Sequence, residues 1–338
     1  MLTRPGGIFP SFKQPYKRIL VIRCNGVSDF RVELAARHLV KAGYDVDIIS
    51  EVPFYSSAQY DIFLCSRPSD GMCEFLDTCI RANRKVIIDM DDDFLNIPPH
   101  NEAYKYVGAG NMGYHKKLLN VMERSNVVYA SQELINRYKL PGIVIPNCYD
   151  EDNPFWDLPK VESEYFRLGF TGTRTHREDF KMILPAIRQV LSERPDVQLV
   201  VGLDEQILSN FTGFPRIQFK YIPPLVYAEY PQSFRHIDLL LVPLINNTFN
   251  LAKSDIKLVE AGASRTCYVA SAMPVYSDWQ VLTLGGYISG PEEWYKSILH
   301  AIEFKEISPE HAESGHALAL SRTSAAVFPA WLRLIEEL

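Results

Sequence analysis

The sequence lacks the features that mark membrane-spanning, secreted and nucleic-acid-binding proteins. No apolar run approaches the about 18 consecutive residues that a membrane span needs. The first 16 residues contain three prolines and no apolar core, so we do not expect them to act as a secretion signal. The formal net charge is -6 and no basic stripe is present, which argues against a nucleic-acid partner.

The sequence also lacks paired cysteines. None of the six cysteines stands in C-x-x-C spacing, and Cys24, Cys65 and Cys267 lie in or beside apolar runs. Buried, reduced thiols suit these positions better than disulfides or a zinc site. We therefore expect a cytoplasmic protein without a transmembrane segment, and peripheral contact with a membrane remains compatible with the sequence.

Short apolar runs alternate with amphipathic segments along the whole chain. This alternation predicts an α/β protein with parallel sheets covered by helices on both faces. The first half offers strands at 18–23, 46–50, 61–65, 85–89, 126–130 and 142–146. The second half offers them at 166–171, 197–202, 217–222, 238–242 and 266–270.

The segment 147–160 interrupts this alternation, because it is rich in acidic residues and proline and has no periodicity. We predict two Rossmann-like domains, residues 1–155 and residues 156–324, that face each other across a cleft. Ligands of such sheets bind beyond the carboxyl ends of the strands. The segment 325–338 predicts an apolar-faced helix that packs back on the first domain.

The segment 253–260, Lys-Ser-Asp-Ile-Lys-Leu-Val-Glu, carries the clearest chemical signal. It follows an apolar strand and opens a helix, so the ammonium groups of Lys253 and Lys257 and the helix N–H groups can hold a diphosphate. The carboxylate of Glu260, about one turn further on, can accept hydrogen bonds from ribose hydroxyls, as an acidic residue does in dinucleotide folds. An ordinary amphipathic helix is the alternative interpretation.

Several segments of the second half and one that leads into it resemble, by their order and spacing along the chain, the donor-binding domain of retaining GT-B glycosyltransferases. They are the glycine loop 168–176, the strand 195–202, the Ile-Pro-Asn segment 145–147, and the helix and strand 257–271. Cys148 stands where that family usually has glycine. The resemblance implies two Rossmann-like domains, transfer of a sugar from a nucleotide-diphosphate sugar with retention, and neither metal nor bound cofactor.

The resemblance also implies roles for individual residues, with a UDP- or GDP-sugar as donor and a saccharide or other hydroxyl compound as acceptor. Arg174, Lys253 and Lys257 would hold the phosphates, and Glu260 the ribose. Arg174 and Lys257 would stabilise the leaving group, while Asp91 and Asp92 would face the acceptor. The donor site would further include Gly26, Gly172, Thr173, Tyr221, Ile222 and Ser254, with the base near Tyr221 and Ile222.

One departure from the family concerns a glutamate that usually precedes Glu260 by eight positions and contacts the sugar. Ala252 occupies that position here. Lys253 and Ser254 are candidates to take over part of its role. The change also keeps open a nucleotide- or saccharide-binding protein that has the fold but no turnover.

Residues 175–178, Thr-His-Arg-Glu, fit a capping box with Thr175 as N-cap and Glu178 three positions later. The helix would then begin at the cleft, with Arg174, His176 and Arg177 as a cationic wall for the diphosphate. A capped helix with solvated charges is the alternative.

Four carboxylates occur within residues 89–93, directly after a predicted strand. Such a cluster must be solvated, protonated or neutralised by cations. It fits an acceptor-binding wall, a metal site of the D-x-D type, a phosphatase nucleophile, or a solvated loop. A metal-dependent enzyme centred on Asp89–Asp93 is therefore a further functional hypothesis.

The segment 108–113 spells G-x-G-x-x-G, but a dinucleotide fingerprint must follow a strand closely. A proline-containing polar stretch precedes it instead, so we expect a mobile loop near the cleft rather than an NAD site.

Overall fold

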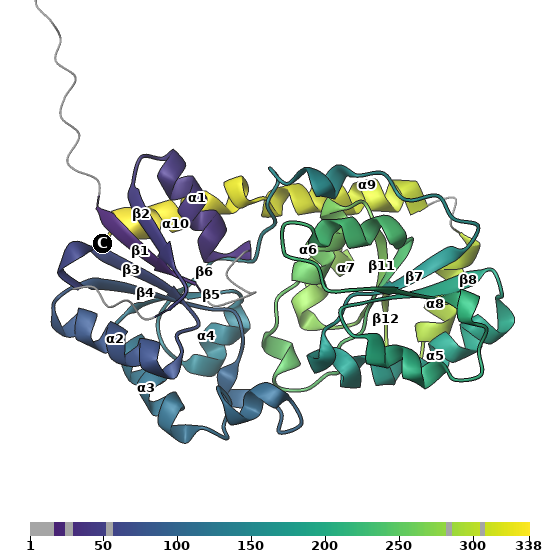
Figure 1. Cartoon of the computed structure of the whole chain (residues 1–338), viewed down its shortest axis with the longest axis horizontal. Coiled ribbons are helices and arrows are strands. Elements are labelled where there is room, and N and C mark those ends of the chain that lie inside the picture. Colours follow the sequence, from purple (N-terminus) through teal and green to yellow (C-terminus); the bar gives the residue numbers. More distant parts are fainter. Residues whose placement is uncertain (1–16, 24–29, 52–56, 282–285, 305–307) are drawn as a thin grey trace, which may run out of the picture.

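The computed structural model describes residues 17–23, 30–51, 57–281, 286–304 and 308–338. These residues form two halves side by side, each built on one sheet (Figure 1). Each sheet has six parallel strands, in the orders β2-β1-β3-β4-β5-β6 and β12-β11-β10-β7-β8-β9. Gly26, which the sequence predicted for the donor site, lies outside the described residues.

The first sheet consists of β1 (Arg18–Ile22), β2 (Asp45–Ile49), β3 (Ile62–Ser66), β4 (Lys85–Met90), β5 (Asn126–Tyr129) and β6 (Ile143–Val144). Alternate strand residues point to opposite faces, and both faces are buried. Leu20 and Phe63 pack under α2 (Asp70–Arg81), α3 (Met112–Met122) and α4 (Gln132–Tyr138). Ile19 and Ile62 pack under α1 (Val32–Lys41).

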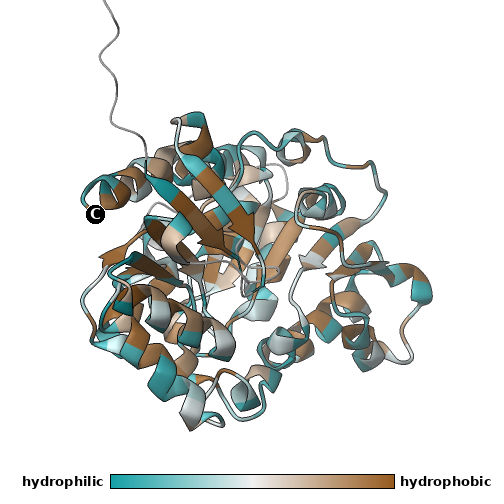
Figure 2. Ribbon diagram, turned by 60° about the vertical axis from the view of Figure 1, so that its left-hand side comes forward, coloured by the Kyte–Doolittle hydropathy of each residue, from teal (hydrophilic) through white to brown (hydrophobic). Residues whose placement is uncertain are grey.

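The second sheet consists of β7 (Phe166–Phe170), β8 (Val197–Gly202), β9 (Phe219–Ile222), β10 (Leu239–Val242), β11 (Cys267–Ser271) and β12 (Gly286–Ser289). One face packs on α5 (Arg177–Glu193) and α8 (Trp294–Glu303). The other packs on α6 (Ile256–Ala263), α7 (Ser277–Val281) and α9 (Ser308–Ala319). Figure 2 shows mostly brown, hydrophobic strands in the interior, and helices that carry both teal, hydrophilic and brown, hydrophobic residues.

The last helix, α10 (Ser324–Glu336), returns to the first half and lies along α1 (Figure 1). Trp331 and Ile335 join the core on that face of the first sheet. Glu151 accepts hydrogen bonds from the backbone N–H groups of Ser324 and Ala325, 2.8 and 2.9 Å away, and so satisfies the start of the helix. The chain thus crosses between the halves twice, and the two crossings are hydrogen-bonded to each other.

The two halves also meet where the turn η10 (Asn250–Ala252) enters the core of the first half. Phe249 and Ala252 are buried there among first-half side chains. The Ser131 hydroxyl donates to the Ala252 carbonyl over 3.1 Å, and the Asn147 amide donates to the Ser254 hydroxyl over 2.6 Å. These contacts fix the start of α6 against the carboxyl edge of the first sheet.

Two local predictions can be compared with the structure. The G-x-G-x-x-G segment follows the turn η4 (Glu102–Lys105) and runs into the first two residues of α3, so no strand directly precedes it. A Cβ at Gly108 would lie 2.7 Å from the Tyr104 Cα, so close packing of this turn explains that glycine. The capping box is wrong, because α5 begins at Arg177 and the Thr175 hydroxyl pairs with that of Thr173 over 2.8 Å.

Candidate functional site

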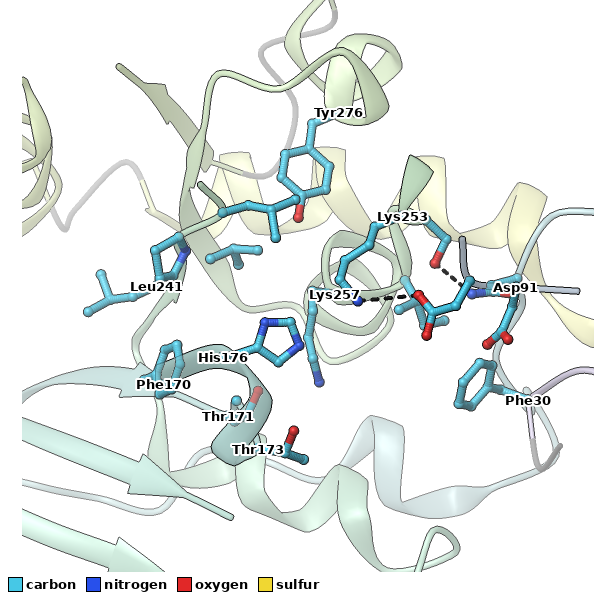
Figure 3. A pocket seen from close by; sticks show the side chains of 18 of the residues that line it. Phe30, Asp91, Phe170, Thr171, Thr173, His176, Leu241, Lys253, Lys257 and Tyr276 are labelled. Carbon is cyan, nitrogen blue, oxygen red and sulfur yellow. Dashed lines mark hydrogen bonds and ion pairs between the residues drawn. The ribbon is translucent and has the colours of Figure 1, made fainter. Parts of the chain in front are cut away.

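A pocket of about 290 Å³ lies between the two halves (Figure 3). The loop after β7, the end of β10 and the start of α6 form its second-half wall. Phe30 and Asn147, together with residues that follow β3 and β4, form the first-half wall. Since these are the carboxyl ends of parallel strands, the pocket is where this architecture places ligands.

The loop after β7 contributes Thr171, Gly172 and Thr173 to the pocket. A Cβ on Gly172 would lie 2.3 Å from the ring of Phe170 and 3.0 Å from the Cβ of His176. Only glycine therefore allows the loop to turn this tightly, and it leaves the backbone open to a ligand.

Lys253, Ser254 and Lys257 line the pocket at the start of α6 (Figure 3). The Lys257 ammonium group donates to Glu260 Oε2 over 2.9 Å and to the Tyr230 hydroxyl over 2.7 Å. Burial lowers the pKa of Lys257, but the charge of Glu260 and the Tyr230 hydroxyl outweigh it, so the pKa rises above its ordinary value. Lys257 is therefore a fixed cation next to the N–H groups that begin α6.

Glu260 lies behind Lys257 and does not line the pocket. Its side chain is 7% exposed and accepts hydrogen bonds from Lys257 and from Tyr230, the latter over 3.1 Å. Burial, with a further contribution from Glu260, raises the pKa of Tyr230 to about 12. In this arrangement Glu260 orients the ammonium group that faces the pocket.

The four carboxylates of residues 89–93 do not act as one cluster. Asp89 is buried and forms a two-point contact with the Arg31 guanidinium group, with Nε 2.8 and 2.9 Å from the two carboxylate oxygens. Asp91 lies 3.2 Å from Arg67 Nε. Asp93 caps the turn η3 (Phe94–Asn96) by accepting from the Leu95 N–H over 3.1 Å.

Asp92 lies between a cation from each half of the protein. Its Oδ2 is 3.4 Å from the Arg67 guanidinium group, and its Oδ1 is 3.3 Å from the Lys253 ammonium group. Asp91, beside it, also lines the pocket. Burial raises the pKa of Asp91 to about 6, since the attraction of Arg67 offsets the cost only in part. The acidic segment is thus neutralised by arginine and lysine, and among the described residues no group of three or more His, Cys, Asp or Glu side chains could hold a metal ion.

Arg31 connects the first sheet to the pocket. It donates to the Asn147 side-chain oxygen as well as to Asp89, and Asn147 in turn donates to Ser254 at the start of α6. Sequence reasoning missed Arg31, Arg67 and Asn147 as parts of this site. The only signal was that four carboxylates after a buried strand require cations from elsewhere in the chain.

Five described residues that the sequence predicted for the donor site do not line the pocket: Arg174, Arg177, Tyr221, Ile222 and Glu260. Arg174 forms an exposed ion pair with Glu102 of the first half, 2.9 Å away. Tyr221 and Ile222 end β9, where Ile222 is part of the core, and neither lines the pocket. Gly26 lies outside the described residues. Eight predicted residues do line it: Asp91, Asp92, Gly172, Thr173, His176, Lys253, Ser254 and Lys257.

Two Rossmann-like halves, each on a six-stranded parallel sheet and with a pocket at their junction, have the architecture called GT-B. No protein-family model and no curated protein matches the sequence. Solved structures do match, and several of them cover nearly the whole chain.

HepE from Anabaena, in complex with UDP and glucose, is 14% identical, with 96% of this chain and 100% of that chain covered and a TM-score of 0.70. Sucrose-phosphate synthase from Thermosynechococcus elongatus is 12% identical, covering 95% and 98%, with a TM-score of 0.69. A glycosyltransferase from Rickettsia africae is 13% identical, covering 96% and 99%, with a TM-score of 0.68. The predicted GT-B fold is therefore confirmed.

Among the residues that the structure describes, no helix is long and apolar enough to cross a membrane.

Proposed function

We propose that this protein is a glycosyltransferase that binds a nucleotide-diphosphate sugar in the pocket and transfers the sugar to an acceptor hydroxyl. The observation that carries the proposal is the convergence of Lys257, Lys253 and the start of α6 on the Gly172 turn. Ammonium groups and helix N–H groups together are suited to a diphosphate. The structural relatives include complexes with UDP and with UDP-glucose, which favours a UDP-sugar, with a GDP-sugar as the alternative.

In this proposal the second half holds the donor and the first half the acceptor. Lys253, Lys257 and Ser254 contact the phosphates, and the base lies toward the end of β9, near Tyr221 and Ile222. Glu260 acts on the ribose or, as its burial favours, through Lys257. Arg174 reaches the phosphates once its exposed ion pair with Glu102 opens.

The chemistry required of the protein is positioning and stabilisation of the charge that develops on the leaving phosphate. Lys257 is suited to stabilise the leaving phosphate, because hydrogen bonds to Glu260 and Tyr230 hold its ammonium group in place before any ligand binds. Asp91 and Asp92 lie across the pocket and can accept hydrogen bonds from an acceptor hydroxyl such as that of a saccharide. We further propose transfer with retention, without a metal ion or bound cofactor, and in the cytoplasm, where buried cysteines such as Cys73 and Cys148 stay reduced.

A second candidate function is a binding protein of the same fold without turnover, and one observation favours it. Ala252, where the family has a sugar-binding glutamate, is fully buried in the core of the first half. The contact that the glutamate would make with the sugar has no replacement from that position.

The first test is a thermal-shift screen with UDP, GDP, ADP, TDP and CMP, each with magnesium and with a chelator. A ligand that binds only the folded state raises the melting temperature. Stabilisation by one nucleoside diphosphate, equal with and without metal, supports the proposed donor site, whereas a shift that requires magnesium favours the acidic segment. No shift with any of the five argues against a donor site.

The second test compares Lys257→Met with Lys296→Met, an exposed lysine on α8 that serves as matched control. Lys257→Met is expected to weaken binding of the diphosphate roughly 10-fold or more, since charge-assisted hydrogen bonds contribute about 1.5–3 kcal/mol each. Lys296→Met is expected to leave binding unchanged. Release of free sugar or transfer to a saccharide acceptor then separates the enzyme from the binding protein.

A further inference from the structure

The pocket contains a histidine whose ring is held by a buried carboxylate. His176 Nδ1 lies 2.9 Å from Asp179 Oδ2. The other oxygen of Asp179 accepts from the Ile245 N–H over 2.9 Å and from the Asn250 side-chain amide over 3.1 Å. Asp179 can therefore only accept, and it fixes the proton of the ring on Nδ1.

The second ring nitrogen, Nε2, is left for the pocket. His176 lines the pocket beside the Thr171–Thr173 loop and Lys257 (Figure 3). Among the described residues, Nε2 has no hydrogen-bond partner, although the side chain is only 27% exposed. This nitrogen is accessible from the pocket, where a bound ligand can supply its hydrogen-bond partner.

The pocket wall has too little net positive charge to balance a bound diphosphate. Its cations Arg67, Lys253 and Lys257 are already opposed by three carboxylates, those of Asp91, Asp92 and Glu260. A nucleotide sugar carries two negative charges on its diphosphate. Its binding therefore favours any change that adds a positive charge to the wall.

We propose that His176 takes up a proton from solvent when the donor diphosphate binds, and that its Nε2–H then donates a hydrogen bond to a phosphate oxygen. Asp179 is the positioning residue, since it holds the ring and balances the added charge. This inference rests on the proposed donor site and adds to it a proton-coupled ligand.

In the free protein, the surroundings of His176 favour its neutral form, as the proposed proton uptake on binding requires. Burial lowers the pKa of His176, and Lys253 and Lys257 lower it further, while Asp179 acts in the opposite sense. His100 faces the same region from the first half, across a small adjoining cavity that Glu178 also lines. A bound diphosphate would counter the two lysine charges and raise the pKa of His176 again.

The sign of the resulting pH dependence follows from linkage. A group whose pKa is higher in the complex binds a proton on association, so affinity falls as pH rises through the interval between the two values. The slope is at most about tenfold in affinity per pH unit for one proton. UDP-glucose is the suitable probe, because both of its phosphates are esterified and do not titrate near neutral pH.

The experiment is titration calorimetry of UDP-glucose in two buffers of different ionisation enthalpy, from below to above pH 6.5, the ordinary value for histidine. The wild type is expected to take up a substantial fraction of a proton. His176→Gln keeps a hydrogen-bond donor but cannot titrate, so uptake is expected to disappear and the affinity to lose its pH dependence. His100→Gln, the matched control, is expected to behave as the wild type.

Asp91 is the other group on the wall that can gain a proton, and Asp91→Asn distinguishes it. Uptake that persists in His176→Gln but disappears in Asp91→Asn would overturn the inference, as would binding without uptake in the wild type. Both results leave the proposed function standing. If neither UDP-glucose, UDP nor GDP binds the folded wild type, the proposed function itself fails and the inference with it.

If only a free nucleoside diphosphate binds, the same comparison uses that ligand. Its terminal phosphate titrates with both proteins, so the difference between wild type and His176→Gln isolates the histidine. Thermal unfolding of each variant shows whether it is folded before binding is compared.

Discussion

Replacing Asp89 by asparagine tests whether the buried ion pair holds the first half together. The side chains of Arg31 and Asp89 are 1% and 0% exposed. Asparagine keeps the shape of Asp89 but removes its charge, which leaves the buried Arg31 guanidinium group with neutral hydrogen-bond partners and only the more distant charge of Asp91. Removing one member of a buried pair typically costs about 3–5 kcal/mol of unfolding free energy.

The double variant Arg31→Met with Asp89→Leu provides the comparison. Both charges are then absent, and replacement of a buried pair by apolar residues is often close to neutral. Here the Asn147 side-chain oxygen loses its donor, which adds about 1–3 kcal/mol. We therefore expect the double variant to be more stable than Asp89→Asn, even though it contains more changes.

Urea unfolding, followed by circular dichroism, gives the unfolding free energy of the wild type, of Asp89→Asn and of the double variant. The values to compare are those for the transition in which the first half unfolds. For a unit of this size, the loss in Asp89→Asn corresponds to a fall of roughly 10 °C in melting temperature. A loss of unfolding free energy below about 1 kcal/mol in Asp89→Asn would refute the reasoning, because a buried arginine without its carboxylate partner should cost more than this. A double variant less stable than Asp89→Asn would refute the charge argument as well.

Three further predictions concern packing and pH. Gly262→Ala is expected to destabilise the protein by roughly 1–3 kcal/mol, because the new Cβ would lie 2.5 Å from a carbonyl oxygen of α9. A Cβ at Gly290 would meet no atom within 4 Å, so Gly290→Ala is the control in the same chemical denaturation experiment. Ala252→Glu, which restores the family residue, is expected to lower stability by more than about 2 kcal/mol, as it buries a carboxylate in an apolar core; an unchanged melting temperature would show that this position opens to the pocket. The folded-state pKa of Asp91 is about 6 against an ordinary 3.8, so the native state binds the extra proton and wild-type stability should fall, relative to Asp91→Asn, as pH rises between these values, by up to about 3 kcal/mol. Parallel stability curves for the two proteins between pH 4 and pH 6 would contradict this assignment.

A chain of hydrogen bonds runs from Asp89 through Arg31 and Asn147 to Ser254 at the start of α6, and it connects the first sheet with the pocket. A change in the first sheet can therefore alter the position of the helix N–H groups that face the pocket. The start of α10 is held at the same place, since Arg322 pairs with Asp255 beside Ser254.

The sequence by itself determined the class of fold and the second-half wall of the pocket. Runs of β-branched residues and helical periodicity are local properties, so the positions of eleven of the twelve described strands and of α6 followed from them, and only β12 was missed. The Gly172 turn and the lysines at the start of α6 belong to the same category. Each depends on residues within a few positions along the chain, so the pattern carried the prediction.

Only the tertiary structure decided which partner each charged side chain takes. Arg31 and Arg67 reach Asp89 and Asp92 from 58 and 25 positions away, across strands that meet only in the folded sheet. The direction of Glu260 depends on which face of α6 packs inward, and that face places it behind Lys257. Such pairings follow from the packing of distant elements, to which local sequence patterns are insensitive.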